Sequence, residues 1–124
     1  MNKEFNCPVE ATISLIGGKY KSVILFHLMG KTLRYSELHK KIPKATDKML
    51  AQQLRELEKD GLIKRTVYPV VPPKTEYNLT EFGESLSPIL NAMCNWGESY
   101  LNIPSQCVDC LLYTSDAADE EDSV

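Results

Sequence analysis

The chain has 124 residues, of which 43% are hydrophobic and 25% charged, so it can form one globular domain with a real core but not two. It has no apolar run of about 18 residues, which excludes a membrane-spanning helix, and no N-terminal signal core. We therefore expect a cytoplasmic protein whose four cysteines are thiols.

The charges that sum to −3 are unevenly distributed along the chain. All 14 basic residues lie at or before Lys74, together with 7 acidic residues, whereas the chain after Lys74 has 10 acidic residues and no basic ones. This basic front indicates a polyanion-binding surface.

Two helices are predicted in the first 30 residues. Cys7-Pro8 begins the first helix, because proline is tolerated at the first helical position, and Gly17-Gly18 breaks it. The second is expected over about residues 19–29, with Gly30 after its end. Residues 32–34 are predicted to form a short extended connection.

The next two predicted helices form a pair. Residues 35–42 carry apolar side chains at helical spacing up to Pro43, and only three residues separate them from a second helix that Thr46 caps and Gly61 ends. Two helices joined by so tight a turn are typical of a helix-turn-helix, whose second helix enters the major groove of DNA.

The second helix of this pair, residues 46–60, has two opposed faces. Leucines 50, 54 and 57 lie on one side. The other side carries long polar side chains, Lys48, Gln52, Arg55 and Lys59. Gln can pair with adenine and Arg with guanine, while Lys adds charge. A solvated charged face is the alternative for an isolated helix, but the neighbouring elements favour a recognition helix.

A β-hairpin is predicted directly after the recognition helix. Residues 62–68 and 75–79 are rich in β-formers, and the proline-rich segment 69–74 between them must be the tip. Such a hairpin is a wing, with Lys74 at its tip and Arg65 and Tyr68 on its first strand. A plain edge hairpin that closes the core is the alternative.

Thr80 is predicted to cap a long C-terminal helical segment that restarts at Ser87-Pro88. Its apolar side chains repeat at helical spacing, which predicts a dimer interface shared with part of the first helix. Folding back onto the chain's own core is the alternative. The predicted interface residues are Ile13, Leu86, Ile89, Leu90, Met93, Trp96 and Tyr100.

With these residues the chain resembles the HxlR-type branch of the winged-helix, MarR-like transcriptional regulators over about residues 6–102. The matching stretches are Cys7-Pro-Val-Glu, Ile16-Gly-Gly-Lys-Tyr-Lys, Arg34-Tyr-Ser-Glu-Leu, Lys48-Met-Leu-Ala-Gln-Gln-Leu-Arg-Glu-Leu, Asp60-Gly-Leu-Ile, Tyr68-Pro-Val-Val-Pro-Pro-Lys, Tyr77-Asn-Leu-Thr and Asn95-Trp-Gly. The resemblance implies an α+β, mostly α, winged helix-turn-helix with a two-stranded β-wing and N- and C-terminal dimerisation helices.

The resemblance also implies a function. It is that of a homodimeric bacterial regulator, more often a repressor, that binds double-stranded DNA at a palindromic operator. We predict that the DNA-binding surface comprises Arg34, Ser36, Lys44, Thr46, Lys48, Met49, Gln52, Gln53, Arg55 and Lys74.

Some members of this family sense electrophiles or oxidants through a cysteine at the position of Cys7. A thiol that faces the free N–H groups of a helix N-terminus, with Lys3 nearby, favours the reactive thiolate. A capping residue without a signalling role is the alternative. The resemblance makes Cys107 a possible disulfide partner of Cys7, whereas Cys94 is expected in the core or the interface.

The end of the chain is expected to be foreign to the domain, which we place at residues 6–103. Residues 104–109 would be a C-terminal extension. The segment 110–124 resembles the translation of a transposon-end adapter used in sequencing libraries, so we expect a non-native, disordered tail there. For this reason Cys107-Val-Asp-Cys110 is not interpreted as half of a metal site.

Nothing in the sequence indicates an enzyme, a metal site or a cofactor. There is no glycine-rich phosphate loop, and no nucleophile has a plausible base near it in sequence. The second hypothesis for function is a winged helix that docks its basic helix on an acidic protein partner instead of DNA. A small electrophile or oxidant is the signal that the Cys7 hypothesis implies.

Overall fold

The computed structural model describes residues 6–102, which form six α-helices and three β-strands. The described chain divides into two compact units, with the boundary between Ser87 and Pro88. In chain order the elements are α1 (Pro8–Ile16), α2 (Lys21–Leu28), β1 (Thr32–Arg34), α3 (Tyr35–Lys41), α4 (Asp47–Lys59), β2 (Ile63–Tyr68), β3 (Lys74–Leu79), α5 (Glu81–Glu84) and α6 (Ser87–Leu101). The mostly helical winged helix-turn-helix expected from the sequence is confirmed.

Local sequence signals account for the ends of α4. The Thr46 hydroxyl accepts a hydrogen bond from the Met49 N–H at 3.1 Å, which satisfies one of the free N–H groups of the first turn. Asp47 in the first turn and Lys59 in the last complement the helix dipole. Gly61 follows with φ +81°, a left-handed conformation that favours glycine and turns the chain toward β2.

The first unit is held by a leucine-rich core. The three leucines of α4, at positions 50, 54 and 57, are at most 2% exposed. Leu25 and Leu28 of α2 and Leu38 of α3 are fully buried. The α2 helix contacts α3, α4 and β3, so this core joins all three helices to the sheet. The predicted apolar face of the recognition helix is confirmed.

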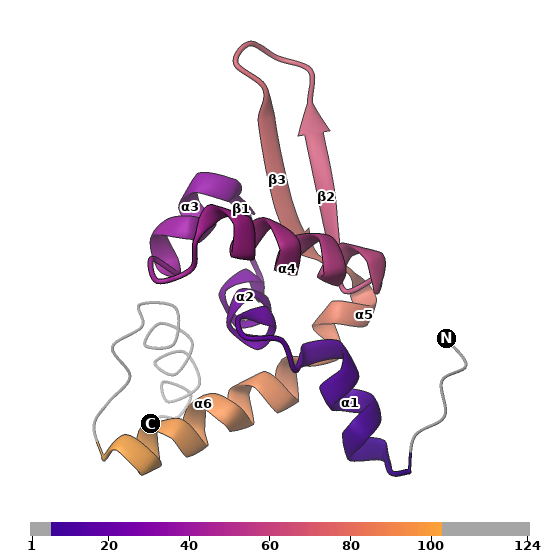
Figure 1. Cartoon of the computed structure of the whole chain (residues 1–124), viewed down its shortest axis with the longest axis vertical. Helices are drawn as coiled ribbons and strands as arrows, with labels where there is room; N and C mark the ends of the chain where they lie inside the picture. Colours follow the sequence, from indigo (N-terminus) through magenta and orange to yellow (C-terminus); the bar gives the residue numbers. More distant parts are fainter. Residues whose placement is uncertain (1–5, 103–124) are drawn as a thin grey trace. The chain divides into compact units, whose positions relative to one another are not determined.

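The sheet has three antiparallel strands in the order β1-β3-β2, one more than the wing alone. Strands β2 and β3 pair from Ile63 with Leu79 to Tyr68 with Lys74, and they project beyond α3 and α4 (Figure 1). The segment 32–34, which we expected to be a connection, pairs with β3 and places Leu33 opposite Tyr77. A three-residue strand is too short for its sequence alternation to be recognised.

The helical segment after the wing is interrupted, as the sequence predicted. The Thr80 hydroxyl accepts the Gly83 N–H at 3.0 Å and donates to the Gly61 carbonyl at 2.6 Å. Thr80 therefore starts α5 and also ties it to the end of α4. A fresh helix, α6, begins at Ser87 and runs to Leu101.

Candidate nucleic-acid interface

The turn between α3 and α4 is fixed by a cluster around Asp47. The ring of His39 lies 3.1 Å from the Asp47 carboxylate through Nδ1 and 2.9 Å from the Ala45 carbonyl through Nε2. The Tyr35 hydroxyl donates to the same carboxylate at 3.0 Å. Burial, and then the hydrogen bond and charge of Asp47, raise the pKa of Tyr35 to about 12, so this phenol remains a donor at neutral pH. The cluster was not predicted from the sequence, although Tyr35 and His39 stand one helical turn apart.

The face of α4 opposite the leucines is open to solvent. Lys48, Gln52, Arg55 and Lys59 are all exposed, as is the capping residue Thr46. Met49 is half-buried. The fixed turn and the buried leucines hold this row of donors on a rigid helix, which is the arrangement needed to enter a groove of DNA.

Gln53 does not belong to this surface, and its assignment to the DNA-binding residues is wrong. Its side chain is buried, and its Oε1 accepts the Tyr20 N–H at 3.0 Å, at the start of α2. One position along a helix turns a side chain by about 100°, so Gln53 faces the protein when Gln52 faces solvent. A buried polar group needs such a partner, and here it is the α1–α2 junction.

A half-buried carboxylate, which was not predicted as part of the site, lies beside this exposed row. Glu56 lies one turn after Gln52, and its Oε2 accepts a hydrogen bond from the Gln52 Nε2 at 3.2 Å. The Lys21 Nζ from α2 lies 2.8 Å from the other oxygen, Oε1. The hydrogen bond from Lys21, followed by that from Gln52, lowers the pKa of the Glu56 carboxyl.

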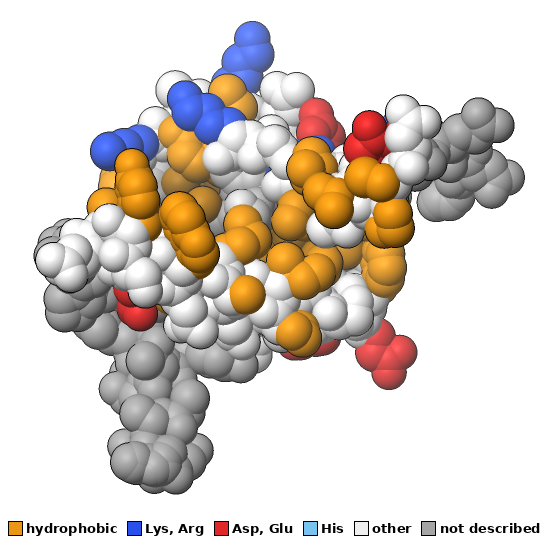
Figure 2. Space-filling view, turned by 90° about the horizontal axis from the view of Figure 1, so that it is seen from below, with side chains coloured by type: hydrophobic (Ala, Val, Ile, Leu, Met, Phe, Trp, Pro, Cys, Tyr) orange, Lys and Arg blue, Asp and Glu red, His pale blue; other side chains and the backbone are white. Residues whose placement is uncertain are grey.

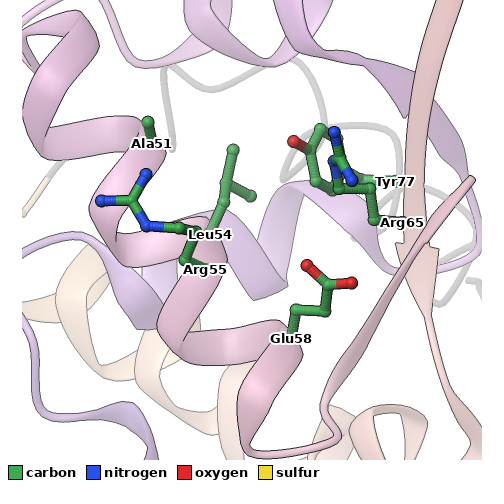
Figure 3. A pocket seen from close by; sticks show the side chains of 6 residues that line it. All are labelled: Ala51, Leu54, Arg55, Glu58, Arg65 and Tyr77. Carbon is green, nitrogen blue, oxygen red and sulfur yellow. The ribbon is translucent and has the colours of Figure 1, made fainter. Parts of the chain in front are cut away.

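A pocket of about 400 Å³ lies between α4 and the hairpin. Ala51, Leu54, Arg55 and Glu58 line it from α4, and Arg65 and Tyr77 from the strands (Figure 3). The Glu58 carboxylate extends toward the strands, whereas the Arg55 guanidinium points away from them (Figure 3). Arg55 is therefore presented outward, in keeping with its predicted role.

The other residues predicted to bind DNA lie around the helix pair α3–α4 and on the wing. Arg34, Ser36 and Lys44 are exposed, at the end of β1, the start of α3 and the turn. Lys74 differs from our expectation because it is half-buried rather than free at the tip. Its Nζ lies 4.9 Å from the centre of the Tyr68 ring and 3.5 Å from Glu76. The tip beyond it is apolar, with Val71 98% exposed.

Cys7 caps the N-terminus of α1 and is exposed as a free thiol. No side-chain hydrogen bond to the helix is formed by this cap. Its predicted partner Cys107 lies outside the described residues, as do Lys3, Cys110 and the segment 104–124. Within residues 6–102, no group of three or more His, Cys, Asp or Glu side chains is placed to hold a metal ion. Among the helices of that range, none is both long and apolar enough to cross a membrane.

The residues predicted for a dimer interface fall into two groups. Ile89, Met93, Trp96 and Tyr100 of α6 are exposed, and the last two stack with ring centres 5.4 Å apart. In the first unit, Ile13 is 55% exposed. Figure 2 shows such exposed hydrophobic side chains in orange. Leu86 and Leu90, which we also predicted for the interface, are instead buried, unlike these exposed side chains. The helical spacing did not separate the inner from the outer part of this stripe.

A helix-turn-helix followed at once by a β-wing defines a winged helix-turn-helix protein. The model of the HxlR-like helix-turn-helix family matches residues 15–105, and the chain belongs to that family.

Known relatives agree with this assignment. The uncharacterized HTH-type transcriptional regulator YdeP of Bacillus subtilis is 54% identical over 94 residues, which are 76% of this chain and 73% of YdeP. The redox regulator HypR in its oxidized form is 50% identical, with a TM-score of 0.72 over 75% of this chain and 96% of HypR. A transcriptional regulator of the MarR family from Porphyromonas gingivalis is 37% identical, with a TM-score of 0.73 over 78% of this chain and 95% of that one. The chain is thus a transcriptional regulator of the helix-turn-helix type.

Proposed function

We propose that the protein is a homodimer that binds a palindromic DNA operator and represses a promoter. The observation that carries this proposal is the exposed row Lys48, Gln52, Arg55 and Lys59 on a helix whose other face is locked into the core. Lys and Arg supply attraction to phosphates, whereas Gln52 and Arg55 can form bidentate contacts with adenine and guanine. In a dimer, two such helices would enter successive major grooves about 34 Å apart.

The test is a gel shift with the intergenic DNA upstream of the gene, across a salt series. Because phosphate contacts release counterions, operator binding should weaken steeply as salt rises. It should also survive an excess of unrelated competitor DNA, because a specific site binds more tightly than random sequence. Loss of all binding to competitor would contradict sequence-specific recognition and favour nonspecific attraction or an acidic protein partner.

Thiol sensing by Cys7 is a second part of the proposal. It is supported by the exposed, free thiol at the N-terminus of α1 and by the 50% identity to HypR, a redox regulator. In its thiolate form such a cysteine is a nucleophile, which attacks an oxidant or electrophile. Modification would shift α1 and, through the dimer, change the separation of the two recognition helices.

The Cys7→Ser variant tests this part separately. We expect its operator binding to match that of the unmodified protein, while diamide or a quinone no longer releases it from DNA. A release that persists in the variant would remove Cys7 from the mechanism without affecting the DNA-binding proposal.

A further inference from the structure

The recognition helix is attached to the α1–α2 junction at two successive points. The Lys21 Nζ forms an ion pair of 2.8 Å with Glu56, and the Tyr20 N–H donates to Gln53 Oε1 at 3.0 Å. The junction fits closely, because a Cβ on Gly18 would lie 2.6 Å from that same Gln53 oxygen. Residues 18–21 therefore hold α4 on the side next to its exposed row. We call this row, Lys48, Gln52, Arg55 and Lys59, the reading face.

The first of these attachments continues onto the reading face. Glu56 uses one carboxylate oxygen for Lys21 and the other for the Gln52 Nε2, at 3.2 Å. Lys21 is a nearly buried cation, with 11% of its side chain exposed, and Glu56 is 41% exposed. A buried ammonium group requires a partner, so Lys21 fixes where the Glu56 carboxylate lies.

This arrangement determines which way the Gln52 amide points. An ionised carboxylate only accepts hydrogen bonds, so the NH₂ end of the amide must face Glu56 and the carbonyl end must face away. Paired with Lys21, the carboxylate stays ionised and keeps this role, in agreement with the lowered pKa of Glu56. The Gln52 carbonyl oxygen and its remaining N–H are then offered to DNA in one fixed orientation, with the acceptor and the donor in defined places. Adenine offers a donor at N6 and an acceptor at N7, a pattern that requires one defined orientation of the amide.

We propose that Glu56, held in place by Lys21, is a positioning residue that orients the Gln52 amide and so determines the base preference of the recognition helix. The proposal rests on the DNA-binding function proposed above. It explains why a carboxylate, which phosphates repel, stands beside a DNA-facing row: its charge is compensated from inside the protein.

The experiment measures base preference rather than affinity alone. Once an operator is identified, duplexes in which each base pair is varied singly compete for the full-length protein. Gln52→Ala first locates the base pair that Gln52 reads, as the position where preference falls by roughly 5- to 150-fold, the worth of one bidentate contact. Glu56→Gln should lose preference at this same position, because a neutral amide no longer imposes one polarity on Gln52. Adding Glu56→Gln to Gln52→Ala should cause no further loss, since both act through one contact.

Controls separate positioning from general damage. The variant Glu58→Gln removes an equal charge from α4 outside this network and should leave the preference unchanged. The double variant Lys21→Met/Glu56→Gln leaves no buried charge unpaired, so it should fold and still show the lost preference. Binding of Glu56→Gln to random DNA should be equal or tighter, because a negative charge is gone, whereas a merely structural role would weaken it.

The outcomes are distinguishable. An unchanged base preference in Glu56→Gln and in the double variant, beside a changed one in Gln52→Ala, overturns the positioning role and leaves the proposed function intact. An unmodified protein that prefers no DNA sequence overturns the proposed function, and the positioning role with it.

Discussion

Arg55 is the side chain on the reading face whose role is most open to measurement. It is exposed on α4, and its guanidinium points away from the strands of the hairpin (Figure 3). An arginine so placed reads a guanine or binds a phosphate, and the two contacts have different consequences. Only the guanine contact discriminates between sequences.

We expect Arg55→Ala to weaken operator binding by roughly 1–3 kcal/mol and to relax preference at one base pair. Competition binding with single-base variants of the operator measures both effects. Lys59→Ala is the matched control, in which binding should weaken evenly across sequences and the salt dependence should become shallower. An even loss in Arg55→Ala as well would make Arg55 a phosphate contact.

Tyr35 gives a second residue-scale prediction, on stability. Its pKa in the folded protein is about 12, above the ordinary value of 10.0, because of burial and the hydrogen bond and charge of Asp47. A raised pKa means that the folded state keeps a proton that the unfolded state releases. This contribution to stability is complete below about pH 10 and is lost as the pH rises toward 12.

We therefore expect the free energy of unfolding of Tyr35→Phe to fall less between pH 10 and pH 12 than that of the unmodified protein. The two proteins should differ in this fall by less than about 1.4 kcal/mol per pH unit, which is the largest effect that one titrating group can have. The effect is smaller here because solvent screens a partly exposed phenol. Urea unfolding at several pH values measures it, with Tyr100→Phe as the control that keeps Tyr35. If the free energies of unfolding of Tyr35→Phe and the unmodified protein fell in parallel with pH, the raised pKa of Tyr35 would be contradicted.

At the scale of elements, sequence periodicity predicted the long helices and the hairpin. Leu50, Leu54 and Leu57 mark one buried face over about two turns, and a signal of that length is not easily overridden. The short strand β1 could not be predicted, because its three residues have no period and depend on pairing with β3.

In the candidate site, the exposed side chains of α4 could be predicted from the sequence, but the contacts of α4 with distant segments could not. Exposure of Lys48, Gln52 and Arg55 follows from their angle to the leucines. The hydrogen-bond partner of Gln53 could not be inferred, because it is the backbone N–H of Tyr20, 33 residues away. The Lys21–Glu56 pair joins α2 to α4 in the same way. Contacts between distant segments have no local signature in a single sequence.

Thr80 links two elements and gives a prediction at this scale. Its hydroxyl caps α5 by accepting the Gly83 N–H, and it also donates to the carbonyl of Gly61, which follows the C-terminal end of α4. Thr80→Ala should lower the free energy of unfolding by about 1–2 kcal/mol, through the lost cap and an unsatisfied carbonyl. Thr80→Ser keeps the hydroxyl and should lose much less. Equal urea midpoints for Thr80→Ala and the unmodified protein would show that water replaces both bonds.

At the scale of the whole molecule, the exposed aromatic side chains of α6 are the basis of the proposed dimer. Trp96 is 70% exposed and Tyr100 74%, although both are large and apolar. Side chains of this kind at a protein surface are typical of an interface, and here the proposed partner is a second copy of the chain.

We expect Trp96→Glu to leave each protomer folded, because the side chain is not in the core, but to separate the dimer and abolish operator binding at physiological salt. Sedimentation velocity and circular dichroism measure the two effects. Asn95→Glu adds the same charge beside it, away from the apolar row, and should remain dimeric and active. A dimeric, DNA-binding Trp96→Glu would place the interface elsewhere.

The most direct test of the proposed function is selection of the preferred sequence from a random pool of duplexes by the unmodified protein. A symmetric dimer with two recognition helices predicts inverted repeats, with half-sites centred about one helical turn, roughly 34 Å, apart. Enrichment of a single half-site, of direct repeats, or of no sequence at all would contradict the proposal that two copies of α4 read DNA together.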